Sequence, residues 1–370
     1  MVTATSIGSR LPDFPWDSLT DATALAKSHP GGLVDLSVGT PVDEVPEVIR
    51  AALASGPAQA PGYPTTTGTP ELHRAAVAAM GRRFGVTGLD EAAVLPTIGS
   101  KEMVAWLPTL LGLGADDLVV VPELAYPTYE VGARLAGAQW VRSDSIVGIG
   151  PRRPKLVWVN SPSNPTGRVL PPEHLRKVVD WARELGAVVA SDECYLALSD
   201  SDSASVLHPD VCGGSTEGLL ALHSLSKSSN LAGYRAGFVT GDPRLVAELL
   251  EVRKHAGMMM PRPVQAAMVA ALDDDEHVHA QWARYRSRRE RLRGALTAFG
   301  LTIEHSEAGL YLWATAGEHC RLTVDRLAAQ GVLVAPGEFY GPAGANYVRV
   351  AATATDERID AAVERLHAAR

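Results

Sequence analysis

The fold of this chain is decided by residues 223–237, which read His223-Ser224-Leu225-Ser226-Lys227-Ser228-Ser229-Asn230-Leu231-Ala232-Gly233-Tyr234-Arg235-Ala236-Gly237. Apolar runs at residues 219–222 and 238–239 flank this stretch and predict two buried strands. Lys227 is therefore expected in a loop at the end of a strand, with serine hydroxyls beside it and Arg235 further along the same loop.

The residue types in this loop suit an aldehyde cofactor that carries a phosphate group. A lysine forms a Schiff base with an aldehyde only while its amine is neutral, and a partly desolvated site with positive neighbours lowers the pKa of the amine. Serine hydroxyls and a fixed arginine fork bind a phosphate dianion through short, charge-assisted hydrogen bonds. A solvated loop with a stray basic residue is the alternative interpretation of this stretch by itself.

The loop resembles a known lysine motif. Ser224-Leu225-Ser226-Lys227, followed by Gly233-Tyr234-Arg235-Ala236-Gly237, is similar to the Ser-x-Ser-Lys and Gly-x-Arg-x-Gly motifs of the fold type I aminotransferases, which use pyridoxal 5′-phosphate (PLP). The resemblance implies that Lys227 is the catalytic lysine and that Ser224 and Arg235 bind the cofactor phosphate. It also implies an α/β fold, in which a large domain with a mostly parallel central sheet carries a smaller C-terminal α/β domain.

Length and composition agree with such a protein. A chain of 370 residues exceeds the usual size of one compact core, so we expect an N-terminal arm at residues 1–35, a large PLP-binding domain at 36–260 and a small domain at 261–370. The arm is expected to pack on the small domain or on the partner subunit. The 46% hydrophobic and 21% charged residues argue against disorder and against a coiled coil. A net charge of -8 argues against nucleic acid as a partner.

One basic run, residues 284–293, could suggest nucleic-acid binding. Apolar and aromatic residues in and around it recur with the period of a helix and fall near one face: Trp282, Tyr285, Leu292, Leu296 and Phe299. We therefore expect a helix whose arginines form a solvated surface on the opposite face.

The cysteines and the apolar runs bear on metal binding and on the cell compartment. Cys194, Cys212 and Cys320 are odd in number and far apart, so they predict neither a disulfide framework nor a metal site and fit a reducing compartment. The first 16 residues contain no apolar signal core, and no uncharged apolar run is long enough to span a bilayer. A cytoplasmic protein without a membrane partner is expected.

Further apolar runs predict two sheets. Buried parallel strands with covering helices are expected for the large domain at residues 118–122, 139–142, 156–160, 187–190, 219–222 and 237–240. Short strands and helices alternate in the C-terminal part, with strands expected at residues 301–305, 309–313, 332–335 and 347–351 and helices at 323–330 and 356–370. Ligand groups gather beyond the carboxyl ends of parallel strands, so the motifs at those ends are expected to share one pocket.

Some of these motifs suit the cofactor. A glycine turn feeds a helix at residues 98–103, where free N–H groups and the helix dipole suit a phosphate, and the resemblance implies that the amides of Ser100 and Lys101 bind it. A carboxylate paired with the pyridine nitrogen would make the ring an electron sink, and the resemblance gives this role to Asp192. It gives Tyr195 a bond to the ring oxygen and gives Tyr126 a stacking position on the ring.

Asn164 lies in Asn164-Pro165-Thr166-Gly167, which is similar to the family's Asn-Pro-Thr-Gly motif. The resemblance implies that Asn164 bonds the ring oxygen and helps to hold the substrate carboxylate, and that the Asn164-Pro165 peptide is cis. A simple turn is the alternative. Arg349 stands alone in the apolar run 347–351, where an unpaired buried arginine needs an anion, and the family uses it to clamp the substrate carboxylate.

Two assignments lie outside these strands. The resemblance implies that Gly39 offers its backbone to the substrate, with a plain turn glycine as the alternative. It also implies that Tyr63 reaches across a homodimer interface to the neighbouring subunit's cofactor phosphate. The alternative for Tyr63 is a turn tyrosine packed on its own helix.

The substrate is predicted from a narrower resemblance. Residues 35–41 and 334–341 look like those of the actinobacterial succinyldiaminopimelate aminotransferases, which implies N-succinyl-LL-2,6-diaminopimelate with 2-oxoglutarate and glutamate as the second pair, in lysine biosynthesis. A second cation would hold the far end of so acidic a substrate, and the unranked candidates are Lys101, Arg253, Lys254 and Arg262. The alternatives are an aspartate or broad-specificity aminotransferase, a PLP-dependent carbon-sulfur lyase and a non-catalytic binding protein.

Overall fold

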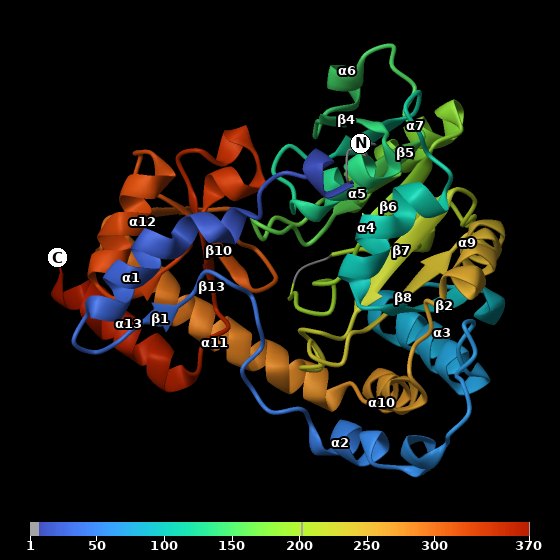
Figure 1. Ribbon diagram of the computed structural model, residues 1–370, viewed down its shortest axis with the longest axis horizontal. Helices are drawn as coiled ribbons and strands as arrows, with labels where there is room; N and C mark the ends of the chain where they lie inside the picture. Colours follow the sequence, from blue (N-terminus) through green and yellow to red (C-terminus); the bar gives the residue numbers. More distant parts are fainter. Residues whose placement is uncertain (1–6, 201–202, 370) are drawn as a thin grey trace, which may run out of the picture.

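The computed structural model describes residues 7–200 and 203–369. Figure 1 shows a larger part built around one twisted sheet and a smaller part that holds the C-terminal helix, with one long helix running between them. Within the described residues, no helix is both long and apolar enough to cross a membrane. Residues 1–6 of the predicted arm and Arg370 of the predicted last helix lie outside the described residues.

The larger part is organised around a seven-stranded sheet in the order β2-β8-β7-β6-β5-β3-β4. Its strands are β2 (Val94–Ile98), β3 (Leu118–Val121), β4 (Gln139–Arg142), β5 (Leu156–Asn160), β6 (Val188–Asp192), β7 (Leu219–Ser224) and β8 (Ala236–Gly241). Strands β5, β7 and β8 are buried along their whole length. The predicted mostly parallel α/β sheet is confirmed, and β2 is a seventh strand that the prediction did not include.

Two details of the predicted sheet are wrong. Strand β8 runs antiparallel to both of its neighbours, β2 and β7, because residues 225–235 reverse the chain directly and a parallel return needs a longer crossover. Strand β4 lies at the edge of the sheet and is partly exposed, since only β3 pairs with it.

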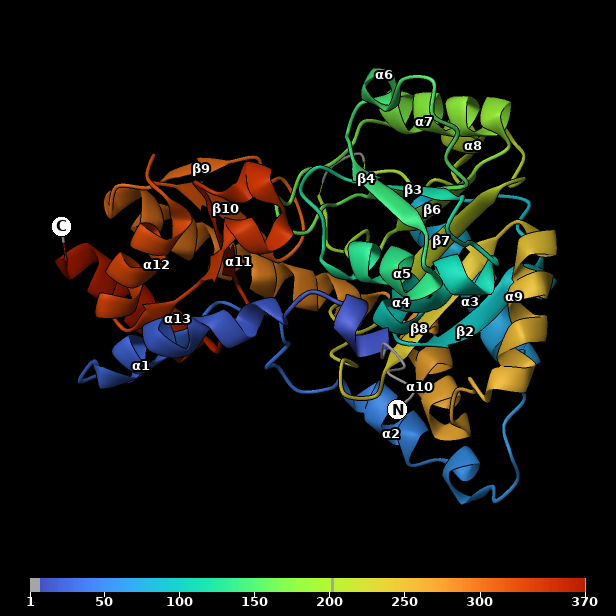
Figure 2. The same cartoon turned by 45° about the horizontal axis from the view of Figure 1, so that its top comes forward.

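Helices cover both faces of this sheet, as Figure 2 shows. Helices α4 (Ser100–Leu110), α5 (Thr128–Ala136) and α9 (Pro243–Ala256) share one apolar core with it, whereas α3 (Pro70–Phe84), α7 (Pro172–Leu185) and α10 (Arg262–Asp273) share the other. Sequence signals mark their ends. Thr69 caps α3 by accepting a hydrogen bond from the Leu72 N–H, and Gly186 ends α7 in the left-handed conformation.

The shorter helices of this part are α2 (Glu47–Leu53), α6 (Ile146–Ile149) and α8 (Pro209–Cys212). Of these, α2 packs against α10 and α8 packs against α7.

The smaller part contains a four-stranded antiparallel sheet in the order β12-β13-β10-β9. Its strands are β9 (Thr302–Glu304), β10 (Tyr311–Thr315), β12 (Ala335–Pro336) and β13 (Val348–Ala351), and its helices are α12 (Cys320–Ala329) and α13 (Asp356–Ala368). The single strand predicted at 332–335 is divided. β11 (Val332–Leu333) pairs with β1 (Val34–Asp35), whereas β12 pairs with β13.

The N-terminal arm contributes to the core of the smaller part. Helix α1 (Thr20–Ser28) packs against α12, and its buried Ala22 and Ala26 belong to the same apolar cluster as Leu327. The arm therefore lies on the C-terminal part of its own chain, although the predicted boundaries at residues 35 and 260 stay a prediction.

The long helix α11 (Glu276–Ala298) connects the two parts (Figure 1). Its predicted solvated arginine face is wrong at two positions. Arg288 is buried and pairs with Asp43 at 2.7 Å and Asp356 at 3.1 Å. Arg289 is buried 5.5 Å from the Trp282 ring centroid and donates to the Ser306 carbonyl. Arg284 and Arg286 remain exposed, so only part of the predicted arginine face is covered by other elements.

Candidate active site

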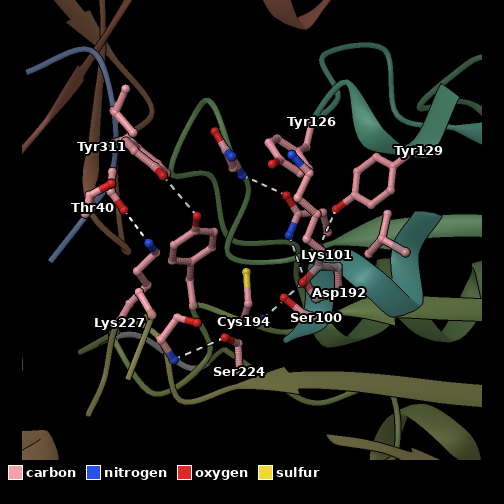
Figure 3. A pocket seen from close by; sticks show the side chains of 18 of the residues that line it. Thr40, Ser100, Lys101, Tyr126, Tyr129, Asp192, Cys194, Ser224, Lys227 and Tyr311 are labelled. Carbon is pink, nitrogen blue, oxygen red and sulfur yellow. Dashed lines mark hydrogen bonds between the residues drawn. The ribbon is translucent and has the colours of Figure 1, made fainter. Parts of the chain in front are cut away.

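A cavity of about 430 Å³ lies where the two parts meet, beyond the carboxyl ends of β5 and β6. Figure 3 shows its polar side chains converging from several elements. The cavity brings together all but one of the predicted site residues, namely Gly39, Ser100, Lys101, Tyr126, Asn164, Asp192, Tyr195, Ser224, Lys227, Arg235 and Arg349. Residues far apart in the sequence therefore share one site.

Lys227 lies in the loop between β7 and β8, and its amine donates a hydrogen bond to the Gly39 carbonyl. The pKa of the Lys227 amine is lowered from 10.5 to about 8, chiefly by burial and also by the nearby guanidinium groups of Arg349 and Arg235, against an opposing effect of Cys194. A substantial fraction of neutral amine therefore exists near physiological pH, as nucleophilic or proton-transfer chemistry requires.

Asp192 ends β6, and its carboxylate is buried without an ion-pair partner among the described residues. The Tyr129 hydroxyl donates to Oδ2 at 2.8 Å, and the Cys194 N–H donates to Oδ1 at 3.3 Å. Burial raises the pKa of the Asp192 carboxyl, and these two donors oppose that rise. A protonated ring nitrogen would supply the positive partner that the carboxylate lacks.

A cradle for an anion forms at the N-terminus of α4. Gly99 precedes the helix with φ of 73°, and a Cβ added there would lie 2.2 Å from Nη2 of Arg235. The guanidinium thus approaches the first helical turn, whose N–H groups have no partner within the helix. Ser224 lines the same cavity. This combination fits a phosphate group.

Arg349 extends from β13 into the cavity and is 2% exposed. Its Nη1 donates to Oδ1 of Asn164 at 2.9 Å, and its Nη2 donates to the Ser37 carbonyl at 2.6 Å. The Tyr311 ring lies against the guanidinium at 4.1 Å, and the buried Nε has no hydrogen-bond partner. No carboxylate of the described residues neutralises Arg349, so the site fits an external carboxylate. The Asn164–Pro165 peptide is cis, as predicted.

The structure does not bring Tyr63 to this cavity. Its side chain is 89% exposed, so the alternative of a tyrosine packed on its own helix is wrong. Its role across a dimer interface stays a prediction.

Of the four candidates for a second cation, only Lys101 lines the cavity. Arg253 is wrong as a pocket-mouth residue, because it is fully buried and pairs with Glu102 at 2.6 Å. Lys254 pairs with Glu251, and Arg262 donates to the Tyr63 carbonyl outside the cavity.

Several lining residues have no assigned role in the sequence motifs. Tyr129 lies in the first turn of α5 and donates to Asp192, and no sequence motif marks it for this role. Tyr311 places its hydroxyl 3.0 Å from that of Tyr195. Phe14 and Trp16 reach the cavity from the N-terminal arm, which carries no recognisable motif.

One cluster elsewhere could suggest a metal site that the spacing of the cysteines does not predict. His319, Cys320 and Glu338 each place one ligand atom within 4.8 Å of the others. However, Arg321 pairs with Glu338 at 2.6 Å, and the Arg321 N–H donates to Nδ1 of His319 at 3.3 Å. Two of the three groups are therefore already engaged by the protein.

Comparisons with known proteins agree with this site. The family model described as aminotransferase class I and II matches residues 32–366. A probable aminotransferase of Mycobacterium tuberculosis is 64% identical over 97% of this chain and 86% of its own length. The 4-dedimethylamino-4-oxo-anhydrotetracycline transaminase OxyQ of Streptomyces rimosus is 57% identical over 96% of this chain and 99% of its own. A solved structure titled probable N-succinyldiaminopimelate aminotransferase, from Thermus thermophilus, is 30% identical with a TM-score of 0.85, covering 96% of this chain and 100% of that one.

Proposed function

The chain belongs to the class I and II aminotransferases, which use pyridoxal 5′-phosphate, and on that premise we propose that its cavity transfers an amino group from N-succinyl-LL-2,6-diaminopimelate to 2-oxoglutarate. The observation that carries the assignment of the site is Lys227, whose lowered pKa and position in the same cavity as Asp192 and Arg349 suit this chemistry.

The residues of the cavity fit the cofactor. The amides of Ser100 and Lys101, with Ser224 and Arg235, would hold its phosphate, and Tyr63 of a second subunit would add to them. Asp192 would hold the ring nitrogen protonated, with Tyr126 against the ring and with Asn164 and Tyr195 at the ring oxygen. When bound, pyridoxal phosphate supplies an electron sink that makes the α-hydrogen of an amino acid acidic.

Lys227 moves the proton in this proposal. Its Nζ, neutral in a substantial fraction near pH 8, would accept the proton from the α-carbon of the substrate and would then donate it to the carbon of the bound cofactor that carried the aldehyde. The second half-reaction, with 2-oxoglutarate, runs the same proton movement in reverse. The Tyr129 hydroxyl supports Asp192 throughout, since it donates to the carboxylate at 2.8 Å.

Arg349 would orient the substrate. Its guanidinium is held on two sides by the Asn164 amide and the Ser37 carbonyl, which leaves Nε buried and unpaired. A substrate α-carboxylate would supply the missing negative charge through charge-assisted hydrogen bonds. The Gly39 carbonyl accepts from Lys227 in the same corner of the cavity, so the lysine and the carboxylate clamp are adjacent.

A long acidic substrate is supported by Lys101. With Arg235 assigned to the phosphate and Arg349 to the α-carboxylate, Lys101 is the remaining cation of the described cavity lining apart from Lys227. Its ammonium lies 5.8 Å from the ring centroid of Tyr126. The name of the T. thermophilus structure agrees with this substrate class.

A second candidate is amination of a ring ketone in a polycyclic aromatic compound. Phe14 and Trp16 add an aromatic wall to the cavity. The 57% identity to OxyQ gives this candidate its weight. An aspartate or broad-specificity aminotransferase and a carbon-sulfur lyase would use the same catalytic groups.

A panel of amino donors tests the proposal. The purified protein is loaded with pyridoxal phosphate and mixed with each donor and 2-oxoglutarate, and kcat/KM is measured for succinyldiaminopimelate, aspartate and an anhydrotetracycline-type amine. We expect succinyldiaminopimelate to exceed the others by at least about tenfold, and Lys101→Met to reduce that preference while sparing aspartate.

Other outcomes would redirect the assignment. A preference for the tetracyclic amine would favour the second candidate, and release of pyruvate and ammonia from cystathionine without an acceptor would favour a lyase. If Lys227→Ala kept wild-type turnover, the site itself would be wrong.

Two broader parts of the proposal concern assembly and location. We propose a homodimer in which Tyr63 completes the partner's site, supported by the 89% exposure of its side chain. We also propose a cytoplasmic protein, supported by the free thiols of Cys194, Cys212 and Cys320.

A further inference from the structure

A buried set of hydrogen bonds ties the loop of Lys227 to helix α11, and we infer that Ser229, His277 and Asp274 are positioning residues for the Lys227 amine. The inference rests on the proposed role of Lys227 as the residue that holds the cofactor and moves the proton. None of the three lines the cavity, so they act through the loop.

The contacts run from the lysine loop to the first turn of α11. The Ser229 Oγ lies 2.8 Å from Nε2 of His277, and Nδ1 of His277 lies 3.0 Å from Oδ2 of Asp274. Ser229 is fully buried, and the His277 side chain is 6% exposed. Buried polar groups are costly to leave unpaired, so Ser229 and His277 are held to each other, and the only other hydroxyl near Ser229 Oγ among the described residues is that of Ser228 at 3.4 Å. Asp274, with a side chain 28% exposed, holds the far side of the imidazole.

The directions of these hydrogen bonds follow from the charge of His277. Burial lowers the pKa of His277, although Asp274 opposes this effect, so the imidazole is neutral at neutral pH. Asp274 accepts the hydrogen on Nδ1, which leaves Nε2 to accept from the Ser229 hydroxyl. Arg83 of α3 also acts on His277, and its own partner is Asp275 at 2.6 Å.

Two more hydrogen bonds reach the loop from the same row of α11. The Oε1 of Gln281 accepts from Nδ2 of Asn230 at 3.0 Å, and the Tyr285 hydroxyl donates to the Lys227 carbonyl at 3.3 Å. His277, Gln281 and Tyr285 are spaced four residues apart and lie above one another on the helix. One helix therefore holds the loop at positions 227, 229 and 230.

The anchored segment is a tight turn with Lys227 at its centre. The Ser229 N–H donates to the Leu225 carbonyl at 3.2 Å, and Asn230 follows with φ of 55° in the left-handed region. Loss of the Ser229 anchor would let the turn shift, and the Lys227 amine would move relative to the Gly39 carbonyl. A misplacement of about 1 Å at a reacting group can cost about 100-fold in rate.

The same three residue types form hydrolytic triads in other proteins. Here the Ser229 side chain has no exposed surface, so no substrate carbonyl can reach its hydroxyl. Ser229 is two residues from Lys227, and Gln281 and Tyr285 form hydrogen bonds to the same loop. Ser229 therefore helps to hold the loop in place. The geometry therefore supports positioning and not nucleophilic attack.

The test breaks each link and compares it with a matched buried hydroxyl. The variants are Ser229→Ala, His277→Gln, their double variant and Asp274→Asn. Thr240→Val is the control, because Thr240 is fully buried in β8 and its hydroxyl has no hydrogen-bond partner. In the cofactor-free protein, acylation of the Lys227 amine is followed across pH by mass spectrometry. In the loaded enzyme, kcat and KM for glutamate are measured.

We expect Ser229→Ala and His277→Gln to move the pH midpoint of Lys227 labelling by about half a unit or more, since the amine changes its surroundings. We expect kcat to fall about tenfold or more with KM within about twofold. The double variant should resemble the more affected single variant, because both break one network. Asp274→Asn keeps an acceptor for Nδ1 of His277, so its labelling midpoint and its kcat should lie between those of the wild type and of His277→Gln. Thr240→Val should match the wild type.

The inference would be overturned if Ser229→Ala left the labelling midpoint and kcat unchanged. It would also be overturned if the effects of Ser229→Ala and His277→Gln on kcat were additive in the double variant. If the contacts only stabilised the fold, the variants would lower the thermal unfolding midpoint and leave the labelling midpoint of Lys227 and kcat unchanged. If the other variants unfold, Asp274→Asn provides a more conservative substitution. Failure of the proposed function is seen separately in the wild type, which would then bind no cofactor at Lys227.

Discussion

At the scale of one residue, the burial of Lys227 lowers the stability of the folded protein and makes the amine more reactive. Its amine keeps a pKa of about 8 because burial disfavours the ammonium. The unfolded chain would hold the proton up to about pH 10.5, so below pH 8 the folded protein carries the full cost of the buried charge. That cost shrinks as the pH rises from 8 to 10.5, because the folded state releases the proton first.

We therefore expect Lys227→Met to stabilise the cofactor-free protein. At pH 7 the gain should be at most about 3.5 kcal/mol, because one unit of pKa corresponds to about 1.4 kcal/mol. The difference from wild type should decline between pH 8 and pH 10.5. Urea unfolding at several pH values checks this. Lys177→Met on the exposed face of α7 is the control, with a change within about 0.5 kcal/mol. A destabilised Lys227→Met protein at pH 7 would contradict the expectation.

The sequence supports prediction of those site residues that lie in local motifs. Lys227, Asp192 and Asn164 each follow a strand, and the structure brings them into one cavity. Tyr311 could not be found in this way, because it belongs to no motif and lies on β10 of the smaller part, more than 100 residues from Tyr195 in the sequence. Side chains supplied by a distant element leave no pattern in the sequence around the site.

At the scale of one element, helix α4 offers a matched pair of glycines. Gly99 and Gly112 flank it with φ of 73° and 72°, so alanine is strained at either position. Only at Gly99 would the new Cβ meet another group, the Arg235 guanidinium at 2.2 Å, whereas nothing lies within 4 Å at Gly112.

We expect Gly99→Ala to weaken cofactor binding about tenfold or more, because it displaces Arg235 from the phosphate cradle. Gly112→Ala should lower the stability of the protein by about 1 kcal/mol, as Gly99→Ala should, but should change the affinity for pyridoxal phosphate little. Titration of the cofactor-free proteins with pyridoxal phosphate, together with thermal melts, separates the two effects. Equal affinities of the two variants for pyridoxal phosphate would show that the close contact between Arg235 and Gly99 is not needed for binding.

The environment of helix α11 could be predicted only in part from its sequence pattern. Its apolar face could be predicted, yet the burial of Arg288 could not, because it depends on Asp43 and Asp356 from segments far away in the sequence. We expect Arg288→Met to destabilise the protein by about 3–5 kcal/mol, since it leaves Asp43 nearly buried without its cation. Arg286→Met should change stability by less than about 1 kcal/mol, because Arg286 pairs with Asp200 on the surface. Denaturant unfolding of both variants checks the contrast.

At the scale of the whole molecule, the order of strands and helices could be predicted better than their directions. The apolar runs located six of the seven strands of the large sheet and missed β2, and the antiparallel direction of β8 depends on the short return through the lysine loop. The arm's packing on the smaller part could be predicted only as one of two alternatives, because β1 pairs with a strand nearly 300 residues away. Such long-range contacts are decided by packing and not by local composition.

The assembly can be tested through Tyr63, which is 89% exposed in one chain and remote from that chain's own cavity. In a two-fold dimer, a residue that acts across the interface completes the partner's site. A mixed dimer of Tyr63→Ala and Lys227→Ala subunits would then contain one site with both defects and one site with neither. If Tyr63 acted on its own chain, each site would carry one defect.

We therefore expect the two inactive or weakened variants to recover activity when they are unfolded together and refolded as a mixture. Random pairing makes half of the dimers mixed, so the mixture should regain about a quarter of wild-type activity, well above either variant alone. Tagging the two variants differently and purifying the mixed dimer gives the cleanest reading, because one intact site per dimer corresponds to about half of the wild-type rate. A mixed dimer no more active than the average of its parents would exclude a role for Tyr63 across the interface and would leave its exposure unexplained.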